Sequence, residues 1–117
     1  MGSISNEEDV KRIFADVIAV EGKLDVLAHF AGILRSFFFT ETSLADFMLP
    51  INVNLIGTFL VCREALPHLI KTKGNIINIS SAAAMYGNAY MSAYSASKGA
   101  VIGTYKITSL GVPATGC

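Results

Sequence analysis

The stretch GNIINISSAAAMYGNAYMSAYSASKGAVIG, from Gly74 to Gly103, carries a strand signal, a loop signal and a helix signal in succession. Its first part, GNIINIS, is an isoleucine-rich run bounded by glycine and serine, which predicts an interior strand. SAAAMYGNAYM then predicts a loop, and a helical pattern runs from Ala93 to about Leu110. Gly111 and Pro113 both oppose helix formation, so the helix should end there.

Upstream of this stretch, the sequence predicts a second strand and two further helices. KLDVLAHFAG, from Lys23 to Gly32, is a short apolar run closed by glycine, which predicts a strand buried on both faces. A helical pattern extends from Ser43 to Lys73, and Pro50 should kink or restart it. Its apolar residues cover more than one stripe, so it should pack against two partners. An earlier helix should begin at an S-x-x-E capping box opened by Ser5 and end at Gly22.

The predicted order of elements is helix, strand, helix, strand, helix, which is typical of the α/β class. Two strands joined through a long helix are expected to be parallel, because antiparallel neighbours need only a short turn. A chain of 117 residues corresponds to about one domain, so residues 1–117 are treated as a single unit. Two strands alone leave open edges and exposed apolar faces, so the isolated chain should be adhesive or marginally stable.

Composition excludes several classes of function. Nine basic and nine acidic residues cancel, so no basic stripe indicates nucleic acid or an anionic membrane surface as a partner. The longest nearly apolar run, LIGTFLVC, is shorter than the ~18 residues of a membrane span, and MGSISNEEDV has no apolar signal core. No metal-ligand spacing joins Cys62 with Cys117 or His29 with His68. We therefore expect a reduced, cytoplasmic protein without a metal site or a membrane segment.

Four polar residues have a mutual spacing that is far more specific than a solitary tyrosine–lysine pair. Tyr94 and Lys98 stand four residues apart on the last helix and share one face. Ser81 lies thirteen residues before Tyr94, just past the second strand, where open parallel sheets keep their ligand crevice. Asn54 lies forty residues before Tyr94, within NVNLIGTFLVCREALPHLI. This combination resembles the short-chain dehydrogenase/reductase family, whose domain is a Rossmann-like doubly wound parallel sheet.

The resemblance implies a role for each of the four residues. Tyr94 would act as general acid and base while hydride moves to or from a nicotinamide ring. A free phenol has a pKa of about 10, and a nearby cation favours its ionised form. Lys98 would supply that charge and hold the nicotinamide ribose hydroxyls. Ser81 would hydrogen-bond the substrate oxygen, and Asn54 would hold a water that links Lys98 to solvent.

Taken alone, each residue also has an ordinary structural interpretation. Ser81 could belong to a turn, and Asn54 could be an unremarkable helix residue, but the four spacings together favour catalysis. Small residues around the pair would let a cofactor approach closely: Ser95, Ala96, Ser97, Gly99 and Ala100. The aromatic run Phe37–Phe39 could line a substrate mouth, and core packing or an interface explains it equally well. The early charges are most simply a solvated helix face: Glu7, Glu8, Asp9, Lys11 and Arg12.

The chain also departs from the family it resembles. It reads HFAG at 29–32, where the family usually carries Asn-Asn-Ala-Gly. Ala31 and Gly32 match and would let the backbone approach the adenosine-side ribose, whereas the missing amides place side-chain contacts there in doubt. The glycine-rich turn that cradles a pyrophosphate has no counterpart, and neither do the family's last strands. The resemblance therefore covers about 6–110, the central strands and active-site helices of an incomplete domain, and does not distinguish NAD from NADP.

These features predict an oxidoreductase that interconverts a small-molecule alcohol and a ketone with NAD or NADP. A catalytically inactive relative that acts only through subunit association is the alternative. An epimerase or dehydratase that uses the same Tyr94 and Lys98 is a third possibility, which the matched Asn54 disfavours. Family members often form dimers through two long helices, so the resemblance implies a homo-oligomer through helices 50–71 and 93–110.

Overall fold

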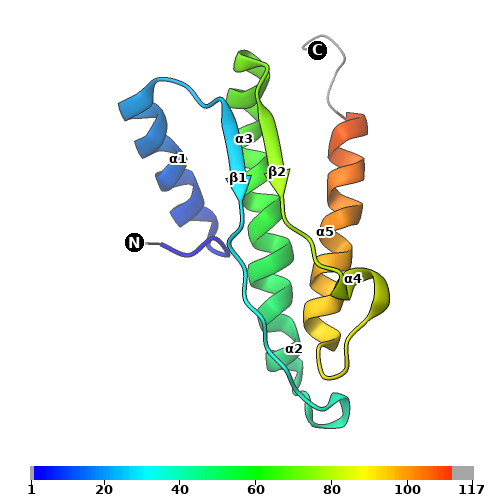
Figure 1. The fold of residues 1–117 in the computed structure, drawn as a ribbon. Helices are drawn as coiled ribbons and strands as arrows, with labels where there is room; N and C mark the ends of the chain where they lie inside the picture. The colour runs from blue at the N-terminus through cyan, green and yellow to red at the C-terminus, as the bar shows by residue number, and fades with distance from the viewer. Residues whose placement is uncertain (1, 112–117) are drawn as a thin grey trace.

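The computed structural model describes residues 2–111, with side chains described as far as residue 104. Its long helices and its strands follow the predicted order (Figure 1), which confirms a partial α/β fold of Rossmann type. The prediction of a loop for residues 81–91 is wrong at Ala83–Tyr86, which form a short helix. They are α1 (Glu7–Glu21), β1 (Val26–His29), the 3-10 helix η1 (Phe39–Glu41), α2 (Leu44–Pro50), the π-helix η2 (Ile51–Ile56), α3 (Gly57–Thr72), β2 (Asn75–Asn78), α4 (Ala83–Tyr86) and α5 (Ser92–Gly111). Pro113 and Cys117, named in the sequence predictions, lie outside the described residues.

Helix α1 begins one residue later than its predicted capping box. Asn6 is the N-cap, and its side-chain oxygen accepts a hydrogen bond from the backbone N–H of Asp9 at 3.0 Å. The hydroxyl of Ser5 is instead engaged with that of Ser3 at 2.8 Å, so the prediction of Ser5 as the cap is wrong. Gly22 ends the helix in the left-handed conformation, with φ of 73°, as the sequence predicted.

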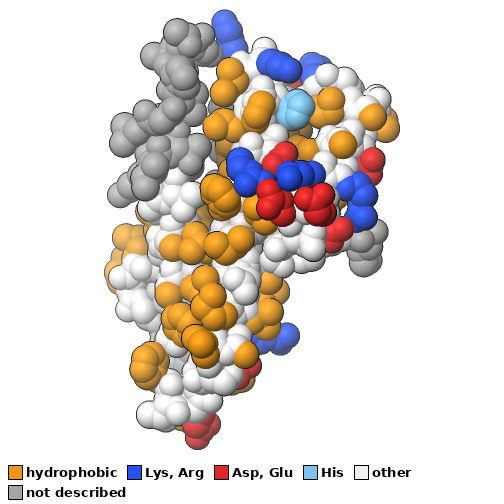
Figure 2. Space-filling view, turned by 180° about the vertical axis from the view of Figure 1, so that it is seen from behind, with side chains coloured by type: hydrophobic (Ala, Val, Ile, Leu, Met, Phe, Trp, Pro, Cys, Tyr) orange, Lys and Arg blue, Asp and Glu red, His pale blue; other side chains and the backbone are white. Residues whose placement is uncertain are grey.

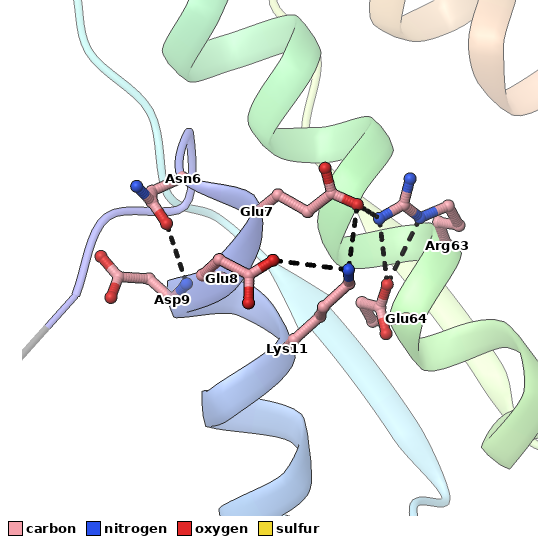
Figure 3. A network of polar contacts seen from close by, with 7 residues as sticks. All are labelled: Asn6, Glu7, Glu8, Asp9, Lys11, Arg63 and Glu64. Atoms are coloured by element: carbon pink, nitrogen blue, oxygen red, sulfur yellow. Dashed lines mark hydrogen bonds and ion pairs between the residues drawn. The ribbon is translucent and has the colours of Figure 1, made fainter.

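Charged side chains join α1 to α3 (Figure 3). Arg63 on α3 donates a hydrogen bond to Glu7 on α1 at 2.6 Å and another to Glu64 at 3.1 Å. Lys11 lies 3.3 Å from the same Glu7 carboxylate. The hydrogen bond from Arg63 is the largest of the effects that hold the pKa of Glu7 below its ordinary value. The predicted solvated face of α1 is exposed, so solvent screening keeps the contribution of these pairs to stability small.

The two strands pair in parallel, as predicted, with Val26 opposite Asn75 and His29 opposite Asn78. Among the described residues the sheet holds two strands, so each strand has one unpaired edge. Figure 1 shows α3 crossing behind both strands. Leu27 points to that side, where it packs against a buried cluster. The cluster consists of Val10, Leu60 and Val61.

Burial of the strands on both faces was expected, and this prediction is wrong. Val26 is 49% exposed and Ile77 is 47% exposed, because residues 2–111 place no layer over the face opposite α3. Side chains alternate between the two faces of a strand, so every second residue is left in solvent. The expectation of exposed apolar faces on a two-stranded sheet is confirmed.

One nearly continuous helical segment, formed by α2, η2 and α3, connects the strands. Pro50 is buried at the end of α2, and the next turn, Ile51–Ile56, has π-type instead of α-type hydrogen bonds. Proline has no N–H to donate, so a change of helix type here agrees with the predicted restart. α3 packs against α1 and both strands, whereas η2 packs against α5, which confirms burial by two partners.

The same segment bears on the membrane prediction. Taken as one helix of 29 residues, Leu44–Thr72 has a window with a mean hydropathy of 1.6, which is enough to cross a membrane by length and composition alone. The sequence prediction counted only the unbroken run LIGTFLVC, whereas the structure extends the helix on both sides of it. The core helix of a soluble protein passes the same test, so this property is weak evidence for a membrane span.

Candidate active site

Helix α5 brings Tyr94 and Lys98 to the carboxyl end of β2. Lys98 is 6% exposed, and its Nζ donates a hydrogen bond to the carbonyl of Ile79 at 3.0 Å. The ammonium lies 6.0 Å from the centroid of the Tyr94 ring. Ser80 donates from its hydroxyl to the carbonyl of Lys98 at 2.8 Å, so the helix and the strand end are joined in both directions. The predicted face shared by the phenol and the ammonium is present.

Ser81 lies between β2 and α4, at the position expected for a ligand crevice. Its oxygen accepts a hydrogen bond from the backbone N–H of Ala83 at 3.2 Å, which fixes the side chain at the start of α4. The hydroxyl hydrogen is still available for donation to a ligand. α4 packs against α5, but Ser81 and Tyr94 form no hydrogen bond with each other within the described part of the chain.

Asn54, in η2, is fully buried and joins three segments. Its Oδ1 accepts from the N–H of Ile33 at 2.8 Å, and its Nδ2 donates to the carbonyl of Ile33 at 2.9 Å and to the Ser97 hydroxyl at 3.0 Å. Thr58 donates to the Asn54 carbonyl at 2.6 Å, and a carbonyl oxygen has a second lone pair. Both hydrogens of the side-chain amide are used by protein groups, and the role of Asn54 in a water relay stays a prediction.

Gly32 lies directly beside this group. A Cβ atom added at Gly32 would be 3.0 Å from Asn54 Oδ1 and 3.5 Å from Lys98 Nζ, so the position accepts only glycine without displacement. Ala31 and Gly32 are both exposed, which leaves their backbone open to an approaching ligand. The structure thus brings Gly32, Asn54, Tyr94 and Lys98 into one connected site, with Ser81 at its border.

His29, which stands where the family has an asparagine, is a packed residue at the end of β1. It is 7% exposed, and its Nε2 has no hydrogen-bond partner among the residues that the structure describes. Burial, and then the positive charge of Lys98, hold the pKa of His29 below its ordinary value. The described residues contain no cluster of three or more histidine, cysteine, aspartate or glutamate side chains that could hold a metal ion.

The aromatic run after β1 borders the start of α5. The side chain of Phe38 is 57% exposed and packs edge-on against Tyr90, with ring centroids 4.9 Å apart. The N–H of Phe37 donates to the carbonyl of Tyr90 at 2.9 Å. The alternative of core packing for this run is therefore wrong for Phe38 and for Phe39, which is 77% exposed. A substrate mouth or an interface remains compatible with this surface.

Sequence reasoning missed two contacts of the site. Ser97 appeared only as a small residue, and its bond to Asn54 spans 43 positions in the chain, so no local pattern announces it. Tyr90 was placed in a loop without a partner, although its position one turn before Tyr94 could have suggested a place near the site.

Comparison with known proteins agrees with this geometry. The family model described as short chain dehydrogenase matches residues 2–116. The chain is 36% identical over 101 residues to a 3-oxoacyl-(acyl-carrier-protein) reductase of Bos taurus, covering 86% of this chain and 43% of the relative. It is 42% identical over 106 residues to the 11-beta-hydroxysteroid dehydrogenase-like 4A of Arabidopsis thaliana, covering 90% and 36%. It is 37% identical over 108 residues to an L-fucose dehydrogenase of Bos taurus, covering 92% and 40%.

These matches extend over most of this chain but less than half of each relative. The chain spans 43%, 36% and 40% of the length of the three relatives, respectively. The matched region contains the strand end, the π-helix and the active-site helix described above. By this match, the chain belongs to the short-chain dehydrogenase family.

Proposed function

We propose that this chain supplies the catalytic centre of an enzyme that interconverts an alcohol and a carbonyl by hydride transfer with NAD(H) or NADP(H). The observation that carries the proposal is the position of Lys98, a buried ammonium tied to the end of β2 and lying 6.0 Å from the Tyr94 ring. Burying a charged amine is costly unless it has partners, so its retention beside a phenol indicates a chemical task.

The donors around Lys98 fit the nicotinamide end of a dinucleotide. An ammonium has three hydrogens, and one of them is used by the carbonyl of Ile79, so two remain for ribose hydroxyls. The exposed backbone at Ala31 and Gly32 supports an approach of the remainder of the cofactor to this side of the site. The dinucleotide, when bound, supplies or accepts the hydride.

The residues of this chain would then transfer the proton and stabilise the charge that develops on the substrate oxygen. In the oxidation of an alcohol, the Tyr94 oxygen takes the hydroxyl proton as hydride leaves the carbinol carbon. In the reverse direction, Tyr94 returns that proton to the carbonyl oxygen. Ser81 donates its hydroxyl hydrogen to the same substrate oxygen and orients it. Asn54 holds the loop at Ile33 and, as the family resemblance implies, would bind a water that links Lys98 to solvent.

The substrate is proposed only as an alcohol or ketone of small-molecule size. The names of the relatives refer to an oxoacyl group, a steroid and a sugar, and the chemistry common to them is the interconversion of a hydroxyl and a carbonyl. The aromatic surface of Phe38 and Tyr90 next to α5 supports an apolar substrate portion without deciding its identity.

Association of copies is part of the same proposal. Figure 2 shows hydrophobic side chains gathered on the lower part of the rear face, below a group of charged residues. Ile56 and Phe59 are 40% and 45% exposed at the junction of η2 and α3. Both residues lie within helices 50–71, and their exposure supports the expected homo-oligomer. In 93–110, the side chains of 105–110 lie beyond those that the structure describes.

The direct test is carbonyl reduction with NADH and with NADPH by the chain and its Tyr94→Phe variant. The change removes only the acid–base hydroxyl, so kcat should fall by about 10²-fold or more. Tyr86→Phe is the matched control, because Tyr86 is 82% exposed, and it should keep the activity of the parent chain. Activity that survives Tyr94→Phe would exclude the proposed mechanism.

A further inference from the structure

The Ser97 hydroxyl connects two of the candidate catalytic residues. Ser97 is fully buried, accepts a hydrogen bond from Asn54 Nδ2 at 3.0 Å, and donates one to the carbonyl of Tyr94 at 2.7 Å. Asn54 in turn binds both backbone groups of Ile33. An unbroken chain of hydrogen bonds therefore runs from the loop after β1, through η2, to the first turns of α5.

The direction of each hydrogen bond in this chain is determined. The N–H of Ile33 can only donate, so the Asn54 atom that faces it must be the oxygen Oδ1. Nδ2 then has two hydrogens, one for the carbonyl of Ile33 and one for the oxygen of Ser97. The hydroxyl of Ser97 must accordingly use its own hydrogen for the Tyr94 carbonyl. No hydrogen of the Asn54 amide is left over, so removal of the Ser97 oxygen leaves one of them unpaired in a buried site.

We propose that Ser97 is a positioning residue, which fixes the Asn54 amide and thereby holds the loop at Gly32 and Ile33 against the active-site helix. Gly32 lies so near Asn54 Oδ1 and Lys98 Nζ that a small displacement of the loop changes the surroundings of the ammonium. That Ser97 fixes the Asn54 amide rests on the hydrogen-bond geometry alone. That this positioning matters for catalysis rests on the proposed function.

The competing explanation is that Ser97 only satisfies a carbonyl of its own helix, as buried serines in helices often do. That explanation accounts for the bond to Tyr94, which is three positions away in the same helix. It does not account for the bond to Asn54, which comes from a different helix. The two explanations differ in what happens at Ile33, which Ser97 does not contact directly.

Ser95 provides a matched control. It belongs to the same helix, and its buried Oγ has no hydrogen-bond partner among the described residues. Ser95→Ala therefore removes the same group as Ser97→Ala without breaking a link to Asn54. Two backbone amides serve as reporters: that of Ile33, which donates to Asn54 Oδ1, and that of Val10 in the distant α1, which donates to the carbonyl of Asn6.

The experiment is amide hydrogen exchange measured by NMR on the full 117-residue chain, which requires no turnover. In Ser97→Ala, the exchange rate at Ile33 should rise by about tenfold relative to its rate in Ser95→Ala, because an unpaired buried amide weakens the Asn54 contacts. Val10 should keep its rate in both variants. Equal rates at Ile33 in the two variants, or a rise at Val10 as large as that at Ile33, would overturn the positioning role.

Two further variants protect the test. If Ser97→Ala does not fold, Ser97→Cys retains a weaker hydrogen-bonding group of similar size and should give an intermediate rate at Ile33. In an Asn54→Ala background, adding Ser97→Ala should leave the Ile33 rate unchanged, because the link through which Ser97 acts is already lost. An additional rise in that background would show that Ser97 acts independently of Asn54 and would reject the proposal. If the chain shows no hydride transfer, the proposed function fails, but the exchange rates expected at Ile33 stay the same.

Discussion

The site around Asn54 (the site side) and the open face of the two-stranded sheet (the sheet side) differ in which side chains they bury. Around Asn54, polar side chains are buried and every hydrogen of the carboxamide is bonded within the chain. On the open face of the sheet, Val26 and Ile77 leave about half of their apolar side chains in solvent, at 49% and 47% exposure. Contacts among the described residues are therefore enough to position the site. The same residues leave one face of the sheet uncovered.

Removal of the Asn54 carboxamide should be the most damaging single change on the site side. Asn54→Ala removes the partner of the partly buried N–H and C=O of Ile33 and the donor to the buried Ser97 oxygen, at about 1 kcal/mol or more for each bond. We expect a loss of at least about 3 kcal/mol in the free energy of unfolding, a large share of the total for a small domain. Urea denaturation measures it.

Asn52→Ala is the control for this change, because Asn52 lies in the same π-helix but is exposed. It should change the free energy of unfolding by no more than about 0.5 kcal/mol. Equal losses for Asn52→Ala and Asn54→Ala would contradict the view that the buried carboxamide holds the site together.

The close approach at Gly32 gives the next largest effect. In Gly32→Ala, the added methyl would lie 3.0 Å from Asn54 Oδ1, and overpacking of this kind costs about 1–3 kcal/mol. Gly103→Ala is the contrasting change, since a Cβ at Gly103 meets nothing within 4 Å on the exposed side of α5. It should stabilise the chain by up to about 1 kcal/mol, because alanine is the better helix former. Thermal unfolding of both variants would show shifts of opposite sign, and shifts of the same sign would argue against the tight contact at Gly32.

His29 makes the stability of the site side depend on pH. Its pKa is lowered by burial and then by Lys98, so as the pH falls the unfolded chain takes up the proton first. The free energy of unfolding should be highest above pH of about 6.5 and decrease below it by at most about 1.4 kcal/mol per pH unit, until the folded protein also binds the proton.

His29→Asn, which introduces the residue the family usually carries, should remove this part of the pH dependence below about pH 6.5. His68→Asn should retain it, since His29 is unchanged in that variant. Urea denaturation at several pH values makes the comparison. An undiminished decline in His29→Asn would assign the effect to other groups.

The sheet side should show the smallest effect. Ile77→Ala removes a side chain that is already half in solvent, so the isolated chain should lose about 1 kcal/mol or less. Leu60→Ala, at a site that is 6% exposed, should cost about 2–5 kcal/mol. Comparable losses for the two variants would show that the open face is covered in solution, for instance by another copy of the chain.

Sequence patterns predicted the elements well where the signal is local. Gly22 and Ser43 mark helix ends through their own backbone preference or side-chain reach, and both act where expected. Ser5 and Asn6 are adjacent residues with similar capping ability. Asn6 caps the helix while Ser5 hydrogen-bonds to Ser3, a contact that the S-x-x-E pattern does not contain. Strand burial was mispredicted because it depends on layers outside the strand itself.

In the candidate site, too, local features could be predicted from the sequence, and contacts between distant residues could not. The shared face of Tyr94 and Lys98 follows from helix geometry, and the structure confirms it. The hydrogen bond from Asn54 to Ser97 joins residues 43 positions apart, and the small space left between Gly32 and Lys98 depends on how a loop packs against a helix. Contacts of this kind follow from tertiary packing, which neither periodicity nor capping signals describe.

Titration of the chain with NADH and NADPH by isothermal calorimetry shows directly whether Lys98 and its neighbours form a dinucleotide site. We expect saturable binding of at least one dinucleotide, which is lost in Lys98→Met and retained in Lys71→Met, an exposed position near the end of α3. Absence of saturable binding to either dinucleotide, or equal binding by the two variants, would contradict it.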